Sequence, residues 1–318
     1  MPAPVSRSSA RRETFMTALR LCLVADIHHG ADSFTKKGTA ALPLLAEFAR
    51  FANETRPDAV IDLGDRISDV DTETDRRLER EVAEGFRAVE APVFHICGNH
   101  DRDHLTVADN AEILGQALGN QVVDLGAWQL VIWRADTRIH RPGGFVLPEA
   151  DLLWLAGVVR TATKPIALFS HVPVSGHAQD GNYYFERNPD ASTYPGGAER
   201  ARAVLAAARV PVACFAGHVH WNTLTMVNGQ PHFTLQSLTE SFTTHPEPAG
   251  SFALLELSDR IDWRVFGKDS FAVSLDAAET ARRWVTPLPP FNEHPEIRLR
   301  QAAQAARQVA SQIAQAAE

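Results

Sequence analysis

Five apolar runs of strand length in this sequence each lead directly into residues that can bind a metal ion, and this repeated order constrains the fold. The segments are LVADIHHG beginning at Leu23, VIDLGDRISD at Val60, HICGNHDR at His95, ALFSHVP at Ala167 and CFAGHVHWN at Cys214. In an α/β sheet, residues at the carboxyl ends of the strands converge on one crevice. We therefore expect a single polar site at the sheet edge where all five segments end.

The side chains at these ends form a mixed nitrogen and oxygen set without a thiolate. Such a set suits manganese, iron, zinc or cobalt rather than an iron–sulfur cluster. There are too many candidates for one tetrahedral ion, but they suffice for two divalent ions that share a carboxylate. By contrast, His95 and His232 are expected to be polar residues with satisfied hydrogen bonds. The candidate ligands are Asp26, His28, Asp65, Asn99, His171, His218 and His220.

In type and order, the five segments resemble the calcineurin-like metallophosphoesterase superfamily, whose pattern is D-x-H, G-D, G-N-H-D/E, a lone His and G-H-x-H. The resemblance extends from about Leu21 to Lys268. It implies that His100 lies over the substrate phosphoryl group and is oriented by Asp101. The metal ligands that it implies are Asp26, His28 and His220 for the first ion, Asn99, His171 and His218 for the second, and Asp65 as the bridge.

Strand and helix patterns alternate along the first half of the chain, which favours a parallel sheet with helices on its faces. With the later strands and the resemblance, this implies an α/β fold in four layers, αββα, with two mixed β-sheets flanked by helices. We expect a mobile leader over residues 1–17, a metallophosphoesterase domain over 18–275, and a linker with a helical extension over 276–318. The extension can pack on the domain or on a second subunit, and the sequence leaves both open.

Helical spacing is expected over Ala40–Asn53, Thr74–Val89 and Ala108–Ala117. A further helix begins at Pro148, with Leu152, Leu153 and Leu155 facing the core. Asn228-Gly229 is typical of a type I′ hairpin turn. The expected strands are Leu19–Ala25, Ala59–Leu63, Pro92–Cys97, Gln121–Leu125, Gln129–Arg134, Ile166–Ser170, Val212–Ala216, Thr223–Val227, His232–Gln236, Phe252–Leu257 and Asp262–Phe266.

Composition disfavours some functions. The formal net charge is −8, which argues against a surface that coats nucleic acid. A small anionic substrate remains compatible, because metal ions supply local positive charge. No apolar run reaches the roughly 20 residues of a membrane-spanning helix. Cys22, Cys97 and Cys214 lie in apolar runs without a C-x-x-C motif, which fits a reducing, cytoplasmic location.

All three tyrosines fall in the Gly/Pro/Asn-rich stretch 175–197, which begins four residues after His171. A loop of this length is usually functional or disordered, and clustered aromatics argue against disorder. Two interpretations stay open here. Either the loop forms a wall of the substrate pocket, with Tyr183, Tyr184 and Arg187 as binding residues, or its aromatic side chains only anchor it to the domain.

Within the superfamily, GDRISD and GNHD differ from the G-D-x-V-D-R-G and G-N-H-E of protein Ser/Thr phosphatases. The spacing is most similar to bacterial phosphodiesterases that act on cyclic nucleotides or glycerophosphodiesters, although Cys97 and Val172 depart from that pattern. The resemblance implies in-line attack by a metal-bridging hydroxide on a small phosphoester, with His100 as proton donor to the leaving group. The alternatives are a phosphomonoesterase, a nuclease, which the acidity disfavours, and a non-catalytic scaffold, in which eroded ligands would be expected.

Overall fold

The computed structural model describes residues 18–284 and 291–316. The expected leader, residues 1–17, and most of the Pro-rich link at 286–291 lie outside the described residues. The chain divides into two compact units, the first ending at Arg282 and the second beginning at Arg283. The expected domain boundary at residue 275 lies shortly before that division. No helix among the described residues is long and apolar enough to cross a lipid bilayer.

The first unit contains two six-stranded sheets and a short two-stranded one. In space, the strand order is β14-β13-β12-β1-β2-β3 in the first sheet and β10-β11-β9-β8-β5-β4 in the second. The strands are β1 Leu19–Val24, β2 Ala59–Asp62, β3 Val93–His95, β4 Gln121–Leu125, β5 Trp128–Ile132, β6 Ile139–His140, β7 Gly144–Phe145, β8 Ile166–Ser170, β9 Val212–Ala216, β10 Thr223–Val227, β11 Gln230–Thr234, β12 Phe252–Leu257, β13 Arg260–Phe266 and β14 Phe271–Asp276. The helices are α1 Ala41–Thr55, α2 Thr72–Phe86, α3 Val107–Leu114, α4 Glu149–Thr161, α5 Ala198–Ala206 and, in the second unit, α6 Pro295–Ala316.

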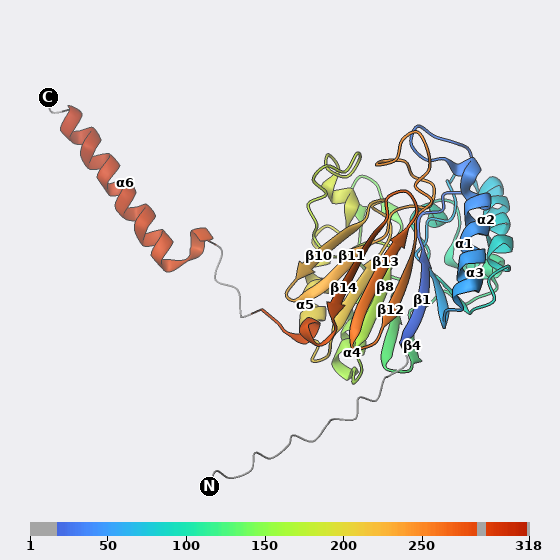
Figure 1. Cartoon of the computed structure of the whole chain (residues 1–318). Helices are drawn as coiled ribbons and strands as arrows, with labels where there is room; N and C mark the ends of the chain where they lie inside the picture. The colour runs from blue at the N-terminus through green and yellow to red at the C-terminus, as the bar shows by residue number, and fades with distance from the viewer. Residues whose placement is uncertain (1–17, 285–290, 317–318) are drawn as a thin grey trace, which may run out of the picture. The chain divides into compact units, whose positions relative to one another are not determined.

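Three hydrophobic clusters give the first unit its four layers (Figure 1). The central cluster lies between the two sheets and includes Leu23, Phe169 and Trp263. A second cluster packs α1 and α2 against the first sheet through Phe48 and Val60. The third packs α4 and α5 against the second sheet. The expected αββα arrangement of two mixed sheets between helical layers is therefore confirmed.

The parallel core of each sheet sets where the ligand segments emerge. Strands β1, β2 and β3 are parallel, with Val24 opposite Asp62 and Asp62 opposite His95. Strands β8 and β9 are also parallel, with Ser170 opposite Ala216 at their ends. Neighbouring strands therefore end level with one another. All five ligand segments leave the sheets at carboxyl ends, where side chains from different strands can meet.

Most expected elements are present, with boundaries shifted by a few residues. Asn228 and Gly229 both have positive φ, 51° and 80°, as a type I′ turn requires. The expectation for Leu153 is wrong: it is 63% exposed, while Leu152 and Leu155 are buried. Leu153 falls on the solvent side because α4 buries the stripe that continues at Val159, three to four residues apart. Strand β14 was not expected.

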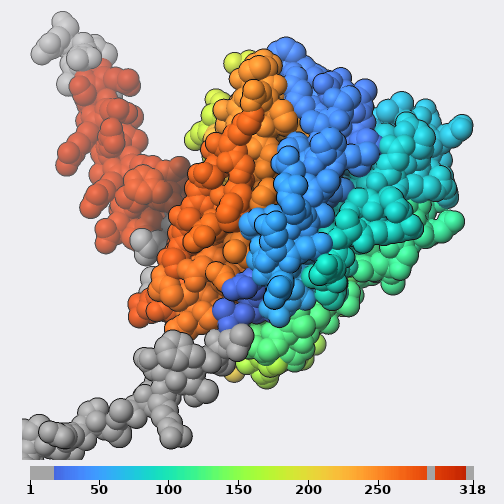
Figure 2. Space-filling model, turned by 45° about the vertical axis from the view of Figure 1, so that its right-hand side comes forward, coloured from blue at the N-terminus to red at the C-terminus, as the bar shows by residue number. Residues whose placement is uncertain are grey.

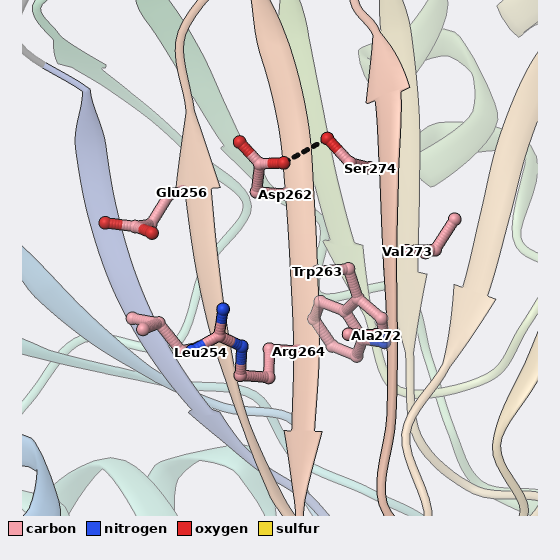
Figure 3. A pocket seen from close by; sticks show the side chains of 8 residues that line it. All are labelled: Leu254, Glu256, Asp262, Trp263, Arg264, Ala272, Val273 and Ser274. Atoms are coloured by element: carbon pink, nitrogen blue, oxygen red, sulfur yellow. Dashed lines mark hydrogen bonds between the residues drawn. The ribbon is translucent and has the colours of Figure 1, made fainter.

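The outer face of the first sheet is only partly covered. In Figure 2 the helices α1 and α2 (blue to cyan) lie beside strands β12–β14 (orange), which reach the surface. These strands form a hollow of about 230 Å³. Figure 3 shows Glu256, Asp262 and Arg264 on this face, with Ser274 of β14 hydrogen-bonded to Asp262. None of the candidate metal ligands lines this hollow.

Candidate metal centre

The candidate ligands converge at the carboxyl ends of the strands as two groups that share one carboxylate. Ligand atoms lie within 4.8 Å of one another in each group, and all the residues in both groups are buried. Asn99 joins the second group, because its Oδ1 lies 3.3 Å from His171 Nε2. The first group is Asp26, His28, Asp65 and His220, and the second is Asp65, His171 and His218.

The backbone at the site takes a conformation that side chains other than glycine rarely adopt. A left-handed backbone costs on the order of 1–3 kcal/mol at a non-glycine residue and persists only where the surroundings impose it. Here hydrogen bonds from Asp26 N to Gly64 O (2.9 Å) and from His28 N to Asp65 O (3.0 Å) tie two ligand loops together. The ligand residues with positive φ are Asp26 (53°), His28 (47°), Asp65 (56°), His218 (72°) and His220 (51°).

Hydrogen bonds orient the two imidazoles of the second group. His171 Nδ1 donates to the Leu63 carbonyl at 2.8 Å, which directs its Nε2 to the site. His218 Nε2 donates to the Ala191 carbonyl at 2.7 Å. The remaining nitrogen of His218, Nδ1, is buried and has no hydrogen-bond partner in the described part of the chain. Because its proton is on Nε2, this nitrogen carries a lone pair, which is what a metal ion requires.

In the first group, a hydrogen bond likewise orients an imidazole. His220 Nδ1 donates to Glu240 Oε2 at 3.0 Å, an outer carboxylate of the kind that orients metal-binding histidines. Its Nε2 lies 3.4 Å from Asp26 Oδ1 and 2.9 Å from His28 Nε2. Two imidazole nitrogens and a carboxylate oxygen thus face one point. The donor set and geometry fit a divalent transition metal.

The charges around the site favour a cation. Burial lowers the pKa of His28 well below its usual value and that of His218 to about 3, so both are neutral. Burial also acts against protonation of His171 and His220, yet nearby carboxylates outweigh it and raise both pKa values to about 9. For His171 the carboxylate is mainly that of Asp65. The buried carboxylates require positive charge beside them, and divalent ions can supply it.

His100 lies beside this centre but not in either ligand group. Its backbone N–H donates to Asp65 Oδ1 at 2.8 Å, and its Nδ1 is paired with the carboxylate of Asp69. Burial acts against ionisation of Asp69, but the bond to His100 and the charge of its ring outweigh this and lower the Asp69 pKa. The Nε2 atom of His100 is 3.5 Å from Lys36 Nζ. The partner that orients His100 is therefore Asp69.

The expectation that Asp101 orients His100 is wrong. The Asp101 carboxylate instead accepts backbone N–H bonds from Asp65 (2.9 Å), Arg66 (2.8 Å) and Gly98 (2.8 Å). Its side chain points back under the loops because these donors lie on the chain segments that carry Asp65 and Asn99. Asp101 consequently holds two ligand loops together and does not touch the His100 ring.

The buried side chain of Arg66 stabilises these loops through ion pairs. Arg66 forms ion pairs with Asp62 at 2.8 Å, Glu79 at 2.6 Å and Asp101 at 3.2 Å. Sequence reasoning missed Arg66, Asp69 and Glu240. Asp69 ends the GDRISD segment and could have been noticed as a second carboxylate there. Glu240 follows His220 by twenty residues, with no motif to mark it.

A cavity of about 360 Å³ opens above the ligands. Its lining includes His100, Lys36, Tyr183 and Tyr184, whereas Arg187 lines a separate surface hollow with the tyrosines. The third tyrosine has a different position: Tyr194 is buried, and its hydroxyl donates to the Asp136 carbonyl. The stretch 175–197 thus contains both an anchoring aromatic residue and two that line the cavity. His95, as expected, is satisfied by Asp62, but Nε2 of buried His232 has no partner among the described residues.

The chain is similar to known proteins in sequence and in fold. The family described as calcineurin-like phosphoesterase matches residues 19–222. A dimetal phosphatase from Danio rerio is similar in structure, with 16% identity, a TM-score of 0.65, and coverage of 81% of this chain and 99% of that one. The phosphoesterase Yfce from E. coli is 12% identical over 81% of this chain and 99% of its own, with a TM-score of 0.39. No curated protein matches the sequence.

Proposed function

Since the chain belongs to the calcineurin-like phosphoesterase family, we propose that it is a phosphodiesterase that hydrolyses a small phosphodiester at a dinuclear metal centre. The family binds two divalent metals. Divalent ions at such a centre, when bound, lower the pKa of water and neutralise charge on the phosphoryl oxygens. The first ion would be held by Asp26, His28 and His220, the second by Asn99, His171 and His218, and Asp65 would bridge them.

His100 is the group that we propose as the general acid. Its Nε2 faces the cavity while Nδ1 is paired with Asp69, so the ring can carry a proton on the side where a leaving alkoxide would appear. The Asp69 carboxylate pairs with Nδ1 and fixes the orientation of the ring. General acid catalysis of this type typically contributes about 10²–10⁴-fold in rate. Asp101 acts as a positioning residue through the ligand loops.

The residues that line the cavity support the proposed preference for diesters. The polar ligand side of the cavity is bordered by apolar side chains, with Ile139, Phe185 and Phe242 besides the tyrosines. A monoester presents three free phosphoryl oxygens, which call for polar partners on every side. In a diester, a second organic group replaces one of these free oxygens. Apolar residues stabilise that group, because the contact removes apolar surface from water.

Turnover of bis(p-nitrophenyl) phosphate and of p-nitrophenyl phosphate, after loading with Mn²⁺, Zn²⁺ or Co²⁺, tests this proposal. We expect higher kcat/KM on the diester, and loss of activity and bound metal in Asp65→Asn. Asp124→Asn, a matched change at an exposed carboxylate outside both ligand groups, is the control. Faster turnover of the monoester would favour the phosphomonoesterase alternative. Two bound ions with no turnover of either ester would favour the non-catalytic scaffold.

Four further expectations stay predictions: the identity of the metal, the exclusion of nucleic acid as a substrate, the cytoplasmic location and self-association. The three cysteines are free and buried.

A further inference from the structure

We propose that Lys36 and an aromatic wall made of Tyr183, Tyr184 and Phe242 form a second subsite beside the metal centre. In it, Lys36 holds a non-bridging phosphoryl oxygen, and the wall holds a flat aromatic ester group of the substrate. The inference rests on the proposed phosphodiesterase function and narrows its substrate class to phosphodiesters with an aromatic ester group.

The wall is assembled from separate segments of the chain. Tyr183 contacts Phe242, which follows β11, with ring centroids 5.4 Å apart. Behind Tyr183, the ring of Phe34, from the loop after β1, stacks at 6.3 Å with an interplanar angle of 29°. Phe34 in turn stacks on His245 at 6.1 Å. These contacts join the loops that surround the cavity mouth into one aromatic surface.

The rings of this surface are unusually accessible for aromatic side chains. Tyr183 is 61% exposed, Tyr184 48% and Phe34 74%. Contiguous exposed apolar surface next to a polar site is typical of ligand recognition. Aromatic rings prefer other flat rings, in offset-stacked or edge-to-face contact, over a chain of similar area. A substrate with an aromatic ester group would therefore gain more from this wall than one with a small alkyl group.

The backbone that carries Tyr184 and Phe185 is held in place before any substrate arrives. The buried Asn182 accepts hydrogen bonds from the backbone N–H groups of Tyr184 and Phe185, both at 3.0 Å, through its Oδ1. Its Nδ2 donates to the Val219 carbonyl at 3.0 Å, between the ligands His218 and His220. The wall is thus fastened to the loop that carries two metal ligands. Such preorganisation reduces the entropy lost on binding.

Lys36 supplies the anion-binding half of the subsite. It is the only lysine or arginine among the described residues that line the cavity. Its Nζ lies 3.5 Å from His100 Nε2, to which the ammonium can donate a hydrogen bond. No carboxylate forms an ion pair with Lys36 within the part of the chain described. A phosphoryl oxygen beside Lys36 would accept the hydrogen bond that its ammonium now donates to His100, and one ester group would then lie next to the wall.

The experiment compares phenyl p-nitrophenyl phosphate with methyl p-nitrophenyl phosphate on the metal-loaded protein, because each diester has one p-nitrophenolate leaving group. We expect the wild type to favour the first by about 2–10-fold in kcat/KM, as one aromatic contact typically provides. In Tyr183→Ala/Tyr184→Ala this ratio should fall towards one. Met226→Ala, which removes an exposed apolar side chain of β10 outside the cavity, should keep it. A wild-type ratio of one, or a ratio unchanged in the double variant, would overturn the aromatic subsite.

Lys36→Gln is compared with Lys37→Gln, a matched change at the next residue, whose Nζ bonds to the Phe34 carbonyl outside the cavity. We expect kcat/KM for both diesters to fall by about tenfold or more in Lys36→Gln with bound metal unchanged, since a charge-assisted hydrogen bond is lost. For both diesters, kcat/KM of Lys37→Gln should stay within about twofold of the wild-type value. Equal behaviour of the two variants would refute the role of Lys36.

A binding measurement separates this inference from the proposed function. Phenylphosphonate and methylphosphonate are titrated calorimetrically into metal-loaded protein, because neither requires turnover. Tighter binding of phenylphosphonate, weakened in both the tyrosine double variant and Lys36→Gln, would support the subsite even if neither diester were hydrolysed. In that case only the proposed function would fail. Equal affinities for the two phosphonates would reject the subsite while leaving diester turnover as a separate result.

Discussion

At the scale of single residues, the site depends on imidazoles whose outer nitrogen is already engaged. His171, His218 and His220 each use one ring nitrogen on a backbone carbonyl or a carboxylate, and present the other to the centre. His100 follows the same rule with Asp69, although it faces the cavity rather than a ligand group. The partners differ in chemistry, but each fixes a tautomer and a ring orientation.

Asp69→Asn tests the pairing of His100. The amide keeps the shape of the side chain but removes the negative charge that is paired with His100 Nδ1. We expect kcat to fall by about 10–100-fold, less than in His100→Asn, with both metals retained. The loss should be smaller on esters with good leaving groups, which need little proton donation. Metal analysis and kinetics on alkyl and p-nitrophenyl esters measure this, and equal losses on both ester types would argue against general acid catalysis.

The His232→Gln variant tests how much folding stability is lost at low pH because a neutral histidine is buried. Burial, with a smaller effect of Arg202, lowers the His232 pKa from 6.5 to about 4. The unfolded chain therefore binds a proton before the folded one as the pH falls below 6.5. Stability present above pH 6.5 is lost as the pH falls towards 4, by about 2 kcal/mol between pH 7.5 and 5. Denaturant unfolding at these pH values should show a correspondingly smaller loss in the variant, and equal losses would refute it.

At the scale of elements, the centre is made by loops whose backbones approach one another closely. The loop after β2 carries Asp65, and the loop after β3 contains Gly98, whose N–H donates to Asp101. A side chain at Gly98 would overlap the carboxylate of Asp65. The tight packing of these two loops explains why a glycine precedes Asn99, without any need for an unusual φ at that position.

Gly98→Ala should therefore displace Asp65 and weaken metal binding, with residual metal content well below that of the wild type. Gly119→Ala is the matched control, because a methyl group there meets nothing within 4 Å and the residue does not have positive φ. Metal analysis after dialysis compares the two. Full metal content in Gly98→Ala would show that the loops can separate at little cost.

At the scale of the whole molecule, the folded domain and the C-terminal helix are separate compact units. The three hydrophobic clusters contain no residue beyond Ala277. Along α6, every side chain from residue 298 to 312 is exposed. Leu299 and Val309 are among these.

A chain that ends at Trp284 should keep its stability and its metal. We expect the free energy of unfolding to change by less than about 1 kcal/mol, because no core residue is removed. Denaturant unfolding and metal analysis measure this, and a larger loss would show that α6 supports the domain. Sedimentation of both chains separately tests self-association. If the full chain sediments as a monomer, α6 does not mediate binding of a second copy under those conditions.

Much of this protein could be predicted from local patterns. Apolar runs of strand length, helical spacing and the turn at Asn228-Gly229 depend on neighbours in sequence, and these elements are present. The convergence of the candidate ligands within each sheet also follows locally, because each one follows a strand in the parallel part of that sheet. The packing of the two sheets against each other brings the two sets of ligands together. Local patterns do not determine whether each individual side chain is buried. The exposure of Leu153, for example, depends on how α4 is rotated about its axis against the sheet.

The tertiary structure alone determined which side chains contact or hydrogen-bond to one another. His220 meets Glu240, His218 meets the Ala191 carbonyl, and Lys36 approaches His100 across sixty-four positions of the chain. These pairs form where loops from different strands fold over the same sheet edge, and no local periodicity encodes such an approach. The sequence by itself determined the fold class and the set of candidate ligands. The orientation of each imidazole and the make-up of the cavity walls depend on long-range packing, which places side chains from distant segments within hydrogen-bonding distance.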